Sequence, residues 1–165
     1  MMNLKESLKS PLFSLTNLYL FISTGGFVGF LPPFPGTLGA LQGIILYYLT
    51  MNLSPILKLL IALILVVLGI ISSGNISRTY QKKDPDEVII DEIAGAYLAS
   101  LGKTTLLELT LVFILFRIID ISKPFPLKRL EKLKGGLGIM MDDVVAGLLT
   151  NLLVILFFWL FYEIT

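Results

Sequence analysis

Six apolar segments make up most of this chain, and their lengths limit what it can fold into. The segments cover residues 12–31, 37–53, 56–73, 88–101, 104–119 and 144–162. A helix that crosses a lipid bilayer needs about 20 apolar residues, within a range of roughly 17 to 25. Segments 56–73 and 144–162 reach that length, 37–53 is marginal, and the two between them are short. The pattern predicts an all-α, membrane-embedded helical bundle with short or re-entrant helices.

The composition agrees with a membrane protein. Hydrophobic residues make up 55% of the chain and charged residues only 15%, with a mean hydropathy of +0.86. Since a soluble domain carries about 25% charged residues, the apolar excess is too large for one soluble core. A length of 165 residues predicts a single domain over residues 1–165.

The sequence leaves open how three of the segments lie relative to the bilayer. Residues 12–31 follow Lys5 and Lys9, as a signal-peptide core follows its basic residues, and end in a glycine-rich stretch. Because no small-residue cleavage site stands out, we interpret this segment as retained, with its second half broken. Segments 88–101 and 104–119 form either a hairpin that dips into the bilayer or spans packed inside the bundle.

Missing residue types exclude much chemistry. The chain has no cysteine and no histidine, which excludes disulfide scaffolds, thiolate nucleophiles, Ser-His-Asp triads and histidine-ligated metals. A net charge of +1 gives no electrostatic reason to expect nucleic acid binding. Catalysis would depend on carboxylates, lysine, arginine, hydroxyl groups, backbone amides and a hard metal ion.

The acidic residues are concentrated in three places. Most of the 12 acids fall in three groups, namely Asp84, Asp86, Glu87, Asp91 and Glu92, then Asp120, then Asp142 and Asp143. If each segment from residue 37 onward crosses the bilayer, or enters and returns, all three groups reach one membrane face. That face is predicted to hold an acidic pocket.

The basic residues predict on which side of the membrane this face lies. An excess of lysine and arginine marks the cytoplasmic side of a membrane protein. The acidic face also receives Arg78, Lys82, Lys83, Arg117, Lys123, Lys128, Arg129, Lys132 and Lys134, whereas the opposite face receives Lys58 and Lys103. The asymmetry predicts that the acidic pocket faces the cytoplasm.

The pair Asp91–Glu92 is the strongest candidate for function. Acids around residues 84–87 fit a helix N-terminus, where negative charge complements the helix dipole. Asp91 and Glu92 lie inside an apolar run instead, where adjacent carboxylates repel each other and lose hydration. Glu87 precedes Asp91 by four residues, so these two share a helix face.

Two further motifs place charge at the ends of apolar helices. Arg117, Asp120 and Lys123 are spaced three residues apart, which fits either a salt bridge with a basic last turn or a buried arginine that pairs with Asp120 or a phosphate. Asp142 and Asp143 precede the last apolar segment, where an N-cap explains one aspartate but not two.

Residues Gly36 and Thr37 follow a proline-rich stretch and begin an apolar segment. This pattern fits equally a turn with an N-cap and a helix N-terminus that faces a phosphate. The sequence Asp84-Pro-Asp86 superficially matches the aspartate pair of haloacid-dehalogenase-type phosphatases. That chemistry usually places the pair after a buried strand, and Tyr80-Gln-Lys-Lys83 precedes it here, so we discount the match.

Several carboxylates without histidine or cysteine favour a hard cation with oxygen ligands, Mg²⁺ above all and Mn²⁺ as a second candidate. Arg117 and Lys123 on the same face would suit a phosphorylated substrate. Since the pocket lies at the bilayer surface, that substrate is expected to be a lipid headgroup or another amphiphile.

With these residues in view, the chain resembles the phosphatidylglycerophosphatase A family, bacterial membrane enzymes that dephosphorylate phosphatidylglycerophosphate to phosphatidylglycerol. The matching blocks are GFLPPFPGTLG at 29–39, DPDEVIIDEIAG at 84–95, FRIIDISKPFP at 116–126 and GGLGIMMDDVVAG at 135–147. Four blocks in the expected order are far more specific than any one of them.

The resemblance implies a Mg²⁺-dependent phosphomonoesterase of phospholipid biosynthesis at the cytoplasmic face of the bacterial inner membrane. It implies catalytic roles for Asp91, Glu92, Asp120 and Asp143. It implies metal ligands among these four and Asp142, to which Glu87 is a candidate addition, and phosphate binding by Arg117, Lys123, Gly36 and Thr37. Whether water or an aspartate attacks the phosphorus stays open.

Two other functions compete with this interpretation. Another metal-dependent lipid phosphatase or a phosphatidyltransferase would use the same kind of site, but the Asp-Gly-x-x-Ala-Arg signature usual in such transferases is missing. A divalent-cation carrier should place acids at mid-membrane depth. The grouped acids lie at segment ends instead, and only Glu108 lies deeper.

Overall fold

A computed structural model describes residues 15–125, 127–130 and 132–164, and this part of the chain is all-helical. In chain order the helices are α2 (Leu15–Ser23), the 3-10 turn η1 (Val28–Phe30), α3 (Pro35–Thr50), α4 (Pro55–Tyr80), α5 (Ile90–Ser100), α6 (Leu106–Ser122), α7 (Leu127–Leu130) and α8 (Gly136–Ile164). The predicted all-α class is therefore confirmed. Lys5 and Lys9 lie outside the described residues.

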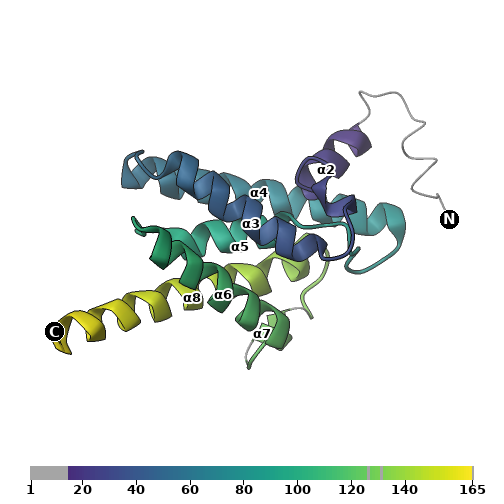
Figure 1. Ribbon diagram of the computed structural model, residues 1–165. Helices are drawn as coiled ribbons and strands as arrows, with labels where there is room; N and C mark the ends of the chain where they lie inside the picture. Colours follow the sequence, from purple (N-terminus) through teal and green to yellow (C-terminus); the bar gives the residue numbers. More distant parts are fainter. Residues whose placement is uncertain (1–14, 126, 131, 165) are drawn as a thin grey trace.

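Helix α5 is the centre of the bundle. It packs against α3, α4, α6 and α8 (Figure 1), and nine of its 11 residues are buried. At 1.5 Å per residue its length is about 16 Å, roughly half of the 30 Å hydrocarbon core of a bilayer. Segment 88–101 therefore forms a helix that is too short to cross this core by itself.

Helices α4 and α8 are long and apolar enough to cross a membrane. Their outward faces carry large apolar side chains such as Leu59, Leu63 and Leu152, each about half exposed. A soluble protein rarely exposes apolar surface on this scale. The two helices correspond to the two segments whose length predicts a span, and the break expected in residues 12–31 occurs after α2.

Two helix boundaries differ from the sequence-based expectation. Helix α4 continues through the polar residues 74–80, which were expected to separate segments, and α8 begins at Gly136 rather than near residue 144. A Cβ atom on Gly136 would lie 1.9 Å from the Ile70 carbonyl oxygen. Gly136 therefore allows the start of α8 to approach α4 closely.

The contact between α5 and α8 depends on two glycines. A Cβ atom on Gly147 would lie 2.3 Å from the Gly95 carbonyl oxygen, and one on Gly95 would lie 2.6 Å from the Asp143 carbonyl oxygen. Both distances are far below van der Waals contact, so neither position accepts a side chain without moving a helix. Small residues allow this kind of close backbone approach between helices in membrane proteins.

We therefore expect Gly147→Ala to destabilise the protein, because the added methyl group pushes α8 away from α5. Overpacking of this kind costs about 1–3 kcal/mol, which thermal unfolding in detergent would show as a lower Tm. Leu148→Ala, at the next and exposed position, is the matched control. An unchanged Tm for Gly147→Ala would mean that the helices are not in tight contact.

Candidate active site

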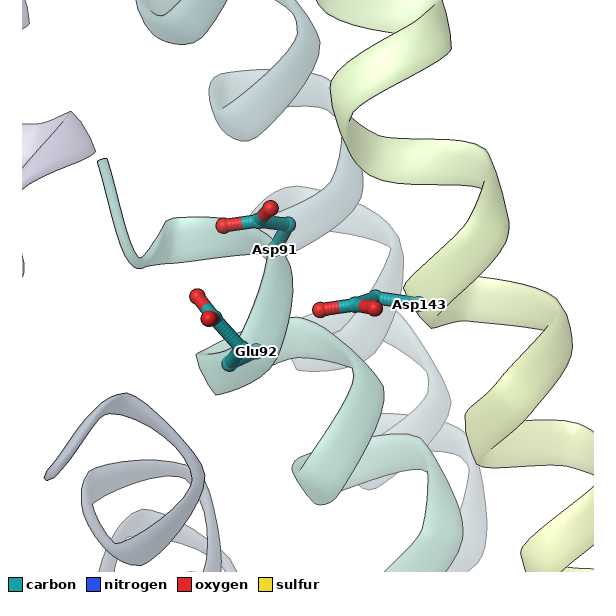
Figure 2. Close-up of side chains that lie close together, drawn as sticks. All are labelled: Asp91, Glu92 and Asp143. Carbon is teal, nitrogen blue, oxygen red and sulfur yellow. The ribbon is translucent and has the colours of Figure 1, made fainter. Parts of the chain in front are cut away.

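Three carboxylates from two helices meet at one end of the bundle. Asp91 and Glu92 come from the first turn of α5 and Asp143 from α8, and Figure 2 shows their side chains converging on a common space. One oxygen of each lies within 4.8 Å of the others. Asp91 and Asp143 are buried, with 8% and 2% of their surface exposed, and Glu92 is only slightly more open.

The residues before α5 hold its first turn inside the protein. The Ile89 amide donates to the Ser23 carbonyl oxygen at 2.9 Å, and the side chains of Val88, Ile89 and Ile90 are all buried in one apolar cluster. Because this apolar run fixes the start of the helix, Asp91 and Glu92 cannot turn outward together. The sequence-based argument that these two acids are not surface decoration agrees with their burial.

Asp142 and Asp143 do not cap a helix. Since α8 begins at Gly136, both lie well inside it and both are buried. The N-cap explanation considered for one of them is therefore wrong. Asp143 belongs to the three-carboxylate cluster. Asp142 is not part of that cluster and instead forms an ion pair with Lys123, at 2.6 Å between Oδ2 and Nζ.

Helix α6 adds a cation to the cluster. The Arg117 guanidinium forms an ion pair with Asp120, three residues later, and its Nη1 lies 3.9 Å from Glu92 Oε1. Arg117 and Asp120 are both largely buried. The salt-bridge and the buried-arginine interpretations of this motif thus both hold, because Arg117 pairs with Asp120 within α6 and also lies close to Glu92.

These groups surround a cavity of about 470 Å³. Its charged and polar lining residues are Thr37, Asp84, Asp86, Asp91, Glu92, Arg117, Asp120, Lys123 and Asp143. All three acidic groups of the sequence contribute to this cavity, as the predicted acidic pocket requires. Which side of a membrane it faces stays a prediction.

The N-terminus of α3 forms another part of the cavity wall. Gly36 and Thr37 lie in its first turn and line the cavity, so the helix-entrance interpretation fits the structure. A Cβ atom on Gly36 would lie 2.1 Å from Glu92 Oε1 and 3.3 Å from Arg117 Nη1. Glycine is needed there because α3 approaches the cluster so closely.

Burial changes the acidity of the α5 carboxylates. It raises the pKa of Glu92 to about 7, an effect that the Asp120 charge strengthens and that Asp91 and Arg117 oppose. Burial also raises the pKa of Asp91, as do the charges of Glu92 and Asp143. A low-dielectric site with several carboxylates disfavours full ionisation unless a cation is present.

The donor set fits a hard cation. Asp91 Oδ1 and Glu92 Oε2 are buried and have no hydrogen-bond partner among the described residues. Buried polar atoms are normally satisfied, so two unpartnered carboxylate oxygens beside a third carboxylate form a ready oxygen-ligand site. Oxygen ligands of this type suit Mg²⁺ or Mn²⁺.

The structure brings two further acids, Asp84 and Asp86, to the cavity, whereas Glu87 is not among its lining residues. Asp84 and Asp86 line the cavity, although the helix dipole alone was enough to explain them in the sequence. Their place in the same block as Asp91 is the feature of the sequence that could have identified them as cavity residues. Glu87 is half-buried, and its carbonyl oxygen packs against Gly29. Helix α4, not a strand, precedes Asp84 by a short connection, which agrees with discounting the haloacid-dehalogenase match.

Comparison with known proteins now identifies the family. A family model described as phosphatidylglycerophosphatase A matches residues 21–158. The chain belongs to the phosphatidylglycerophosphatase A family. It is therefore an enzyme, a hydrolase of the phosphatase class, and the resemblance based on four sequence blocks is confirmed.

Three relatives cover most of the chain. Phosphatidylglycerophosphatase A of Escherichia coli K12 is 29% identical and that of Haemophilus influenzae 32%, over 88% and 82% of this chain and 86% and 85% of theirs. A Bacteroides thetaiotaomicron protein, provisionally named a phosphatidylinositol-3-phosphatase, is 33% identical over 86% of this chain and 94% of its own. No solved structure was found to match the chain.

We expect Gly36→Ala to lower phosphatase activity at least tenfold, because its methyl group would displace the Glu92 carboxylate and misplacement of about 1 Å in a site can cost about 100-fold. The loss should appear in steady-state phosphate release at a Tm close to that of the wild type. Full activity would show that Glu92 does not need this position.

Proposed function

We propose that this phosphatase hydrolyses the terminal phosphomonoester of phosphatidylglycerophosphate, giving phosphatidylglycerol and inorganic phosphate, and that it depends on Mg²⁺, with Mn²⁺ as a substitute. The observation that supports this best is the cluster of Asp91, Glu92 and Asp143 in a cavity that also exposes Arg117 and Lys123. Anionic ligands and cations together fit a metal-assisted reaction on a phosphate.

In this proposal Asp91, Glu92 and Asp143 hold the ion, with Asp120 close by and with Asp142 and Glu87 as candidate outer ligands. When bound, such an ion supplies neutralisation of the phosphoryl oxygens. Arg117 has a buried Nε without a hydrogen-bond partner among the described residues. That donor, Lys123 and the N-terminus of α3 at Gly36 and Thr37 are the groups that would bind the phosphate.

The reaction breaks one P–O bond. Either a water molecule attacks the phosphorus while a carboxylate accepts its proton, or an aspartate attacks and water then hydrolyses the acyl phosphate. In both routes the glycerol oxygen leaves and takes up a proton. Asp91, Glu92, Asp120 and Asp143 are the candidates for the proton-transfer role, because all four line the cavity.

Several properties of the whole protein belong to the same proposal. We infer a single unit over residues 1–165 in the bacterial inner membrane, with several passes and the acidic cavity on the cytoplasmic side, where the lysine and arginine excess lies. Membrane lipids are the expected partners, and no nucleic acid is expected.

The Bacteroides relative supports a second candidate substrate. Its provisional name specifies a 3-phosphate on phosphatidylinositol, which is also a phosphomonoester on a lipid headgroup. The same cavity groups would serve either reaction, so the two lipids need to be compared directly. The transferase and carrier alternatives become the leading ones if neither lipid is hydrolysed.

We expect phosphate release from phosphatidylglycerophosphate in detergent micelles to require Mg²⁺ and to stop with excess chelator. Asp91→Asn should abolish turnover, because it removes one carboxylate of the cluster, without changing the Tm of the metal-free protein by more than a few degrees. Phosphatidylinositol 3-phosphate is assayed in parallel. Release that persists with chelator, or in Asp91→Asn, would remove the metal or Asp91 from the proposal.

We expect Lys123→Ala to raise KM about tenfold with a smaller change in kcat, since a cation that binds the phosphate equally in the ground and transition states affects KM alone. Lys132→Ala, an exposed neighbour in the same basic loop, is the control. Failure of Lys123→Ala to accumulate as folded protein would assign Lys123 to stability through its ion pair with Asp142.

A further inference from the structure

An apolar groove lies between α3 and α6. Its volume is about 330 Å³, and it is lined by Leu41, Ile44, Ile45, Tyr48, Leu106, Leu109, Thr110 and Phe113. Ile44 and Leu109 are buried, with 8% and 4% of their surface exposed, whereas Leu41 and Ile45 are about half exposed. The groove therefore has a closed floor and open edges, and none of the described residues that line it is charged.

The groove continues the two helix faces that line the acidic cavity. On α3, Thr37 lines the cavity and Leu41, one turn later, lines the groove. On α6, Arg117 lines the cavity and Phe113, one turn earlier, lines the groove. Residues four apart lie on one helix face, so the groove starts where the cavity ends.

We propose that this groove holds an acyl chain of the lipid substrate while its phosphate lies in the acidic cavity. The inference rests on the proposed function and adds where the substrate's chain is bound. From Thr37 to Tyr48, α3 rises about 16 Å, close to half of the roughly 30 Å hydrocarbon core. One lipid chain in one leaflet has that reach.

The groove differs from general lipid contact in what it does for the reaction. An acyl chain gains little free energy by moving from bilayer to groove, because both are apolar. A chain held between α3 and α6 instead fixes the headgroup relative to Arg117 and the carboxylate cluster. Positioning of this kind raises the effective concentration of the phosphate at the reacting groups.

The test compares substrates of two chain lengths. Phosphatidylglycerophosphate with 16-carbon chains and with six-carbon chains is assayed in one detergent, with wild type, Ile45→Trp and the control Leu63→Trp. Ile45 lines the groove, whereas Leu63 lies exposed on α4. We expect the wild-type preference for long chains in kcat/KM to fall at least fivefold in Ile45→Trp and to stay unchanged in Leu63→Trp.

A preference that is unchanged in Ile45→Trp, or that falls equally in Leu63→Trp, would overturn the proposal. If wild type hydrolyses neither lipid, the proposed function itself has failed, which is a distinct result. Loss of folding in Ile45→Trp is covered by a second measurement on unmodified protein. A diazirine in the 16-carbon chain should crosslink within residues 41–48 and 106–113, and labelling confined to α4 would contradict the groove.

A second copy of the chain is the competing occupant. Because the chain has no cysteine, Ile45→Cys introduces a single thiol into the groove. Under mild oxidation we expect monomers, since a lipid chain covers this position. Efficient disulfide-linked dimers would show that another protein molecule covers the groove and would overturn the proposal.

Discussion

The close crossing of α5 and α8 decides where three of the buried acids lie. Gly95 and Gly147 let the two helix backbones come together without intervening side chains. Asp143 precedes Gly147 by four residues and so shares its helix face. The crossing therefore presses Asp143 against the first turn of α5, where Asp91 and Glu92 lie. With larger residues at the crossing, Asp143 would lie farther from Asp91 and Glu92.

The carboxylates brought together in this way outnumber their cations. Asp91, Glu92, Asp120, Asp142 and Asp143 are mostly buried, and the ion pairs described above join three of them to Arg117 and Lys123. Buried like charges repel one another and destabilise the folded state unless an opposite charge is bound. Acids gathered at this cost agree with the metal-assisted reaction proposed above and with membership in a phosphatase family.

The sequence predicted the helical class and the gathering of acids for a physical reason. Apolar length and charge grouping are properties of the chain itself, and crossings between segments bring their ends to common faces. It did not predict that α8 starts at Gly136, because the use of Gly136 depends on the Ile70 backbone, a tertiary contact. The same limit applies to Asp84 and Asp86, whose contribution to the cavity depends on how the loop after α4 folds back.

Site geometry was predictable only in part. The spacing of Arg117 and Asp120 within one helix allowed their ion pair to be anticipated, since residues three apart are neighbours. The partner of Lys123 could not be anticipated, because Asp142 lies on a different helix. Gly36 was also predictable only in part. Its place at a helix entrance followed from the prolines, but its contact with Glu92 could not be predicted from the sequence.

The short α5 has a consequence for the direction of substrate movement. Its last carbonyl groups accept hydrogen bonds from the Asn151 side chain on α8, and the Tyr47 hydroxyl donates to the Lys103 carbonyl oxygen. Polar groups at this end are thus engaged with one another, and the acidic cavity is lined only by residues from the other end. In the proposed reaction a lipid headgroup would therefore enter and leave at the same end of the bundle, so its conversion would keep it in the same leaflet.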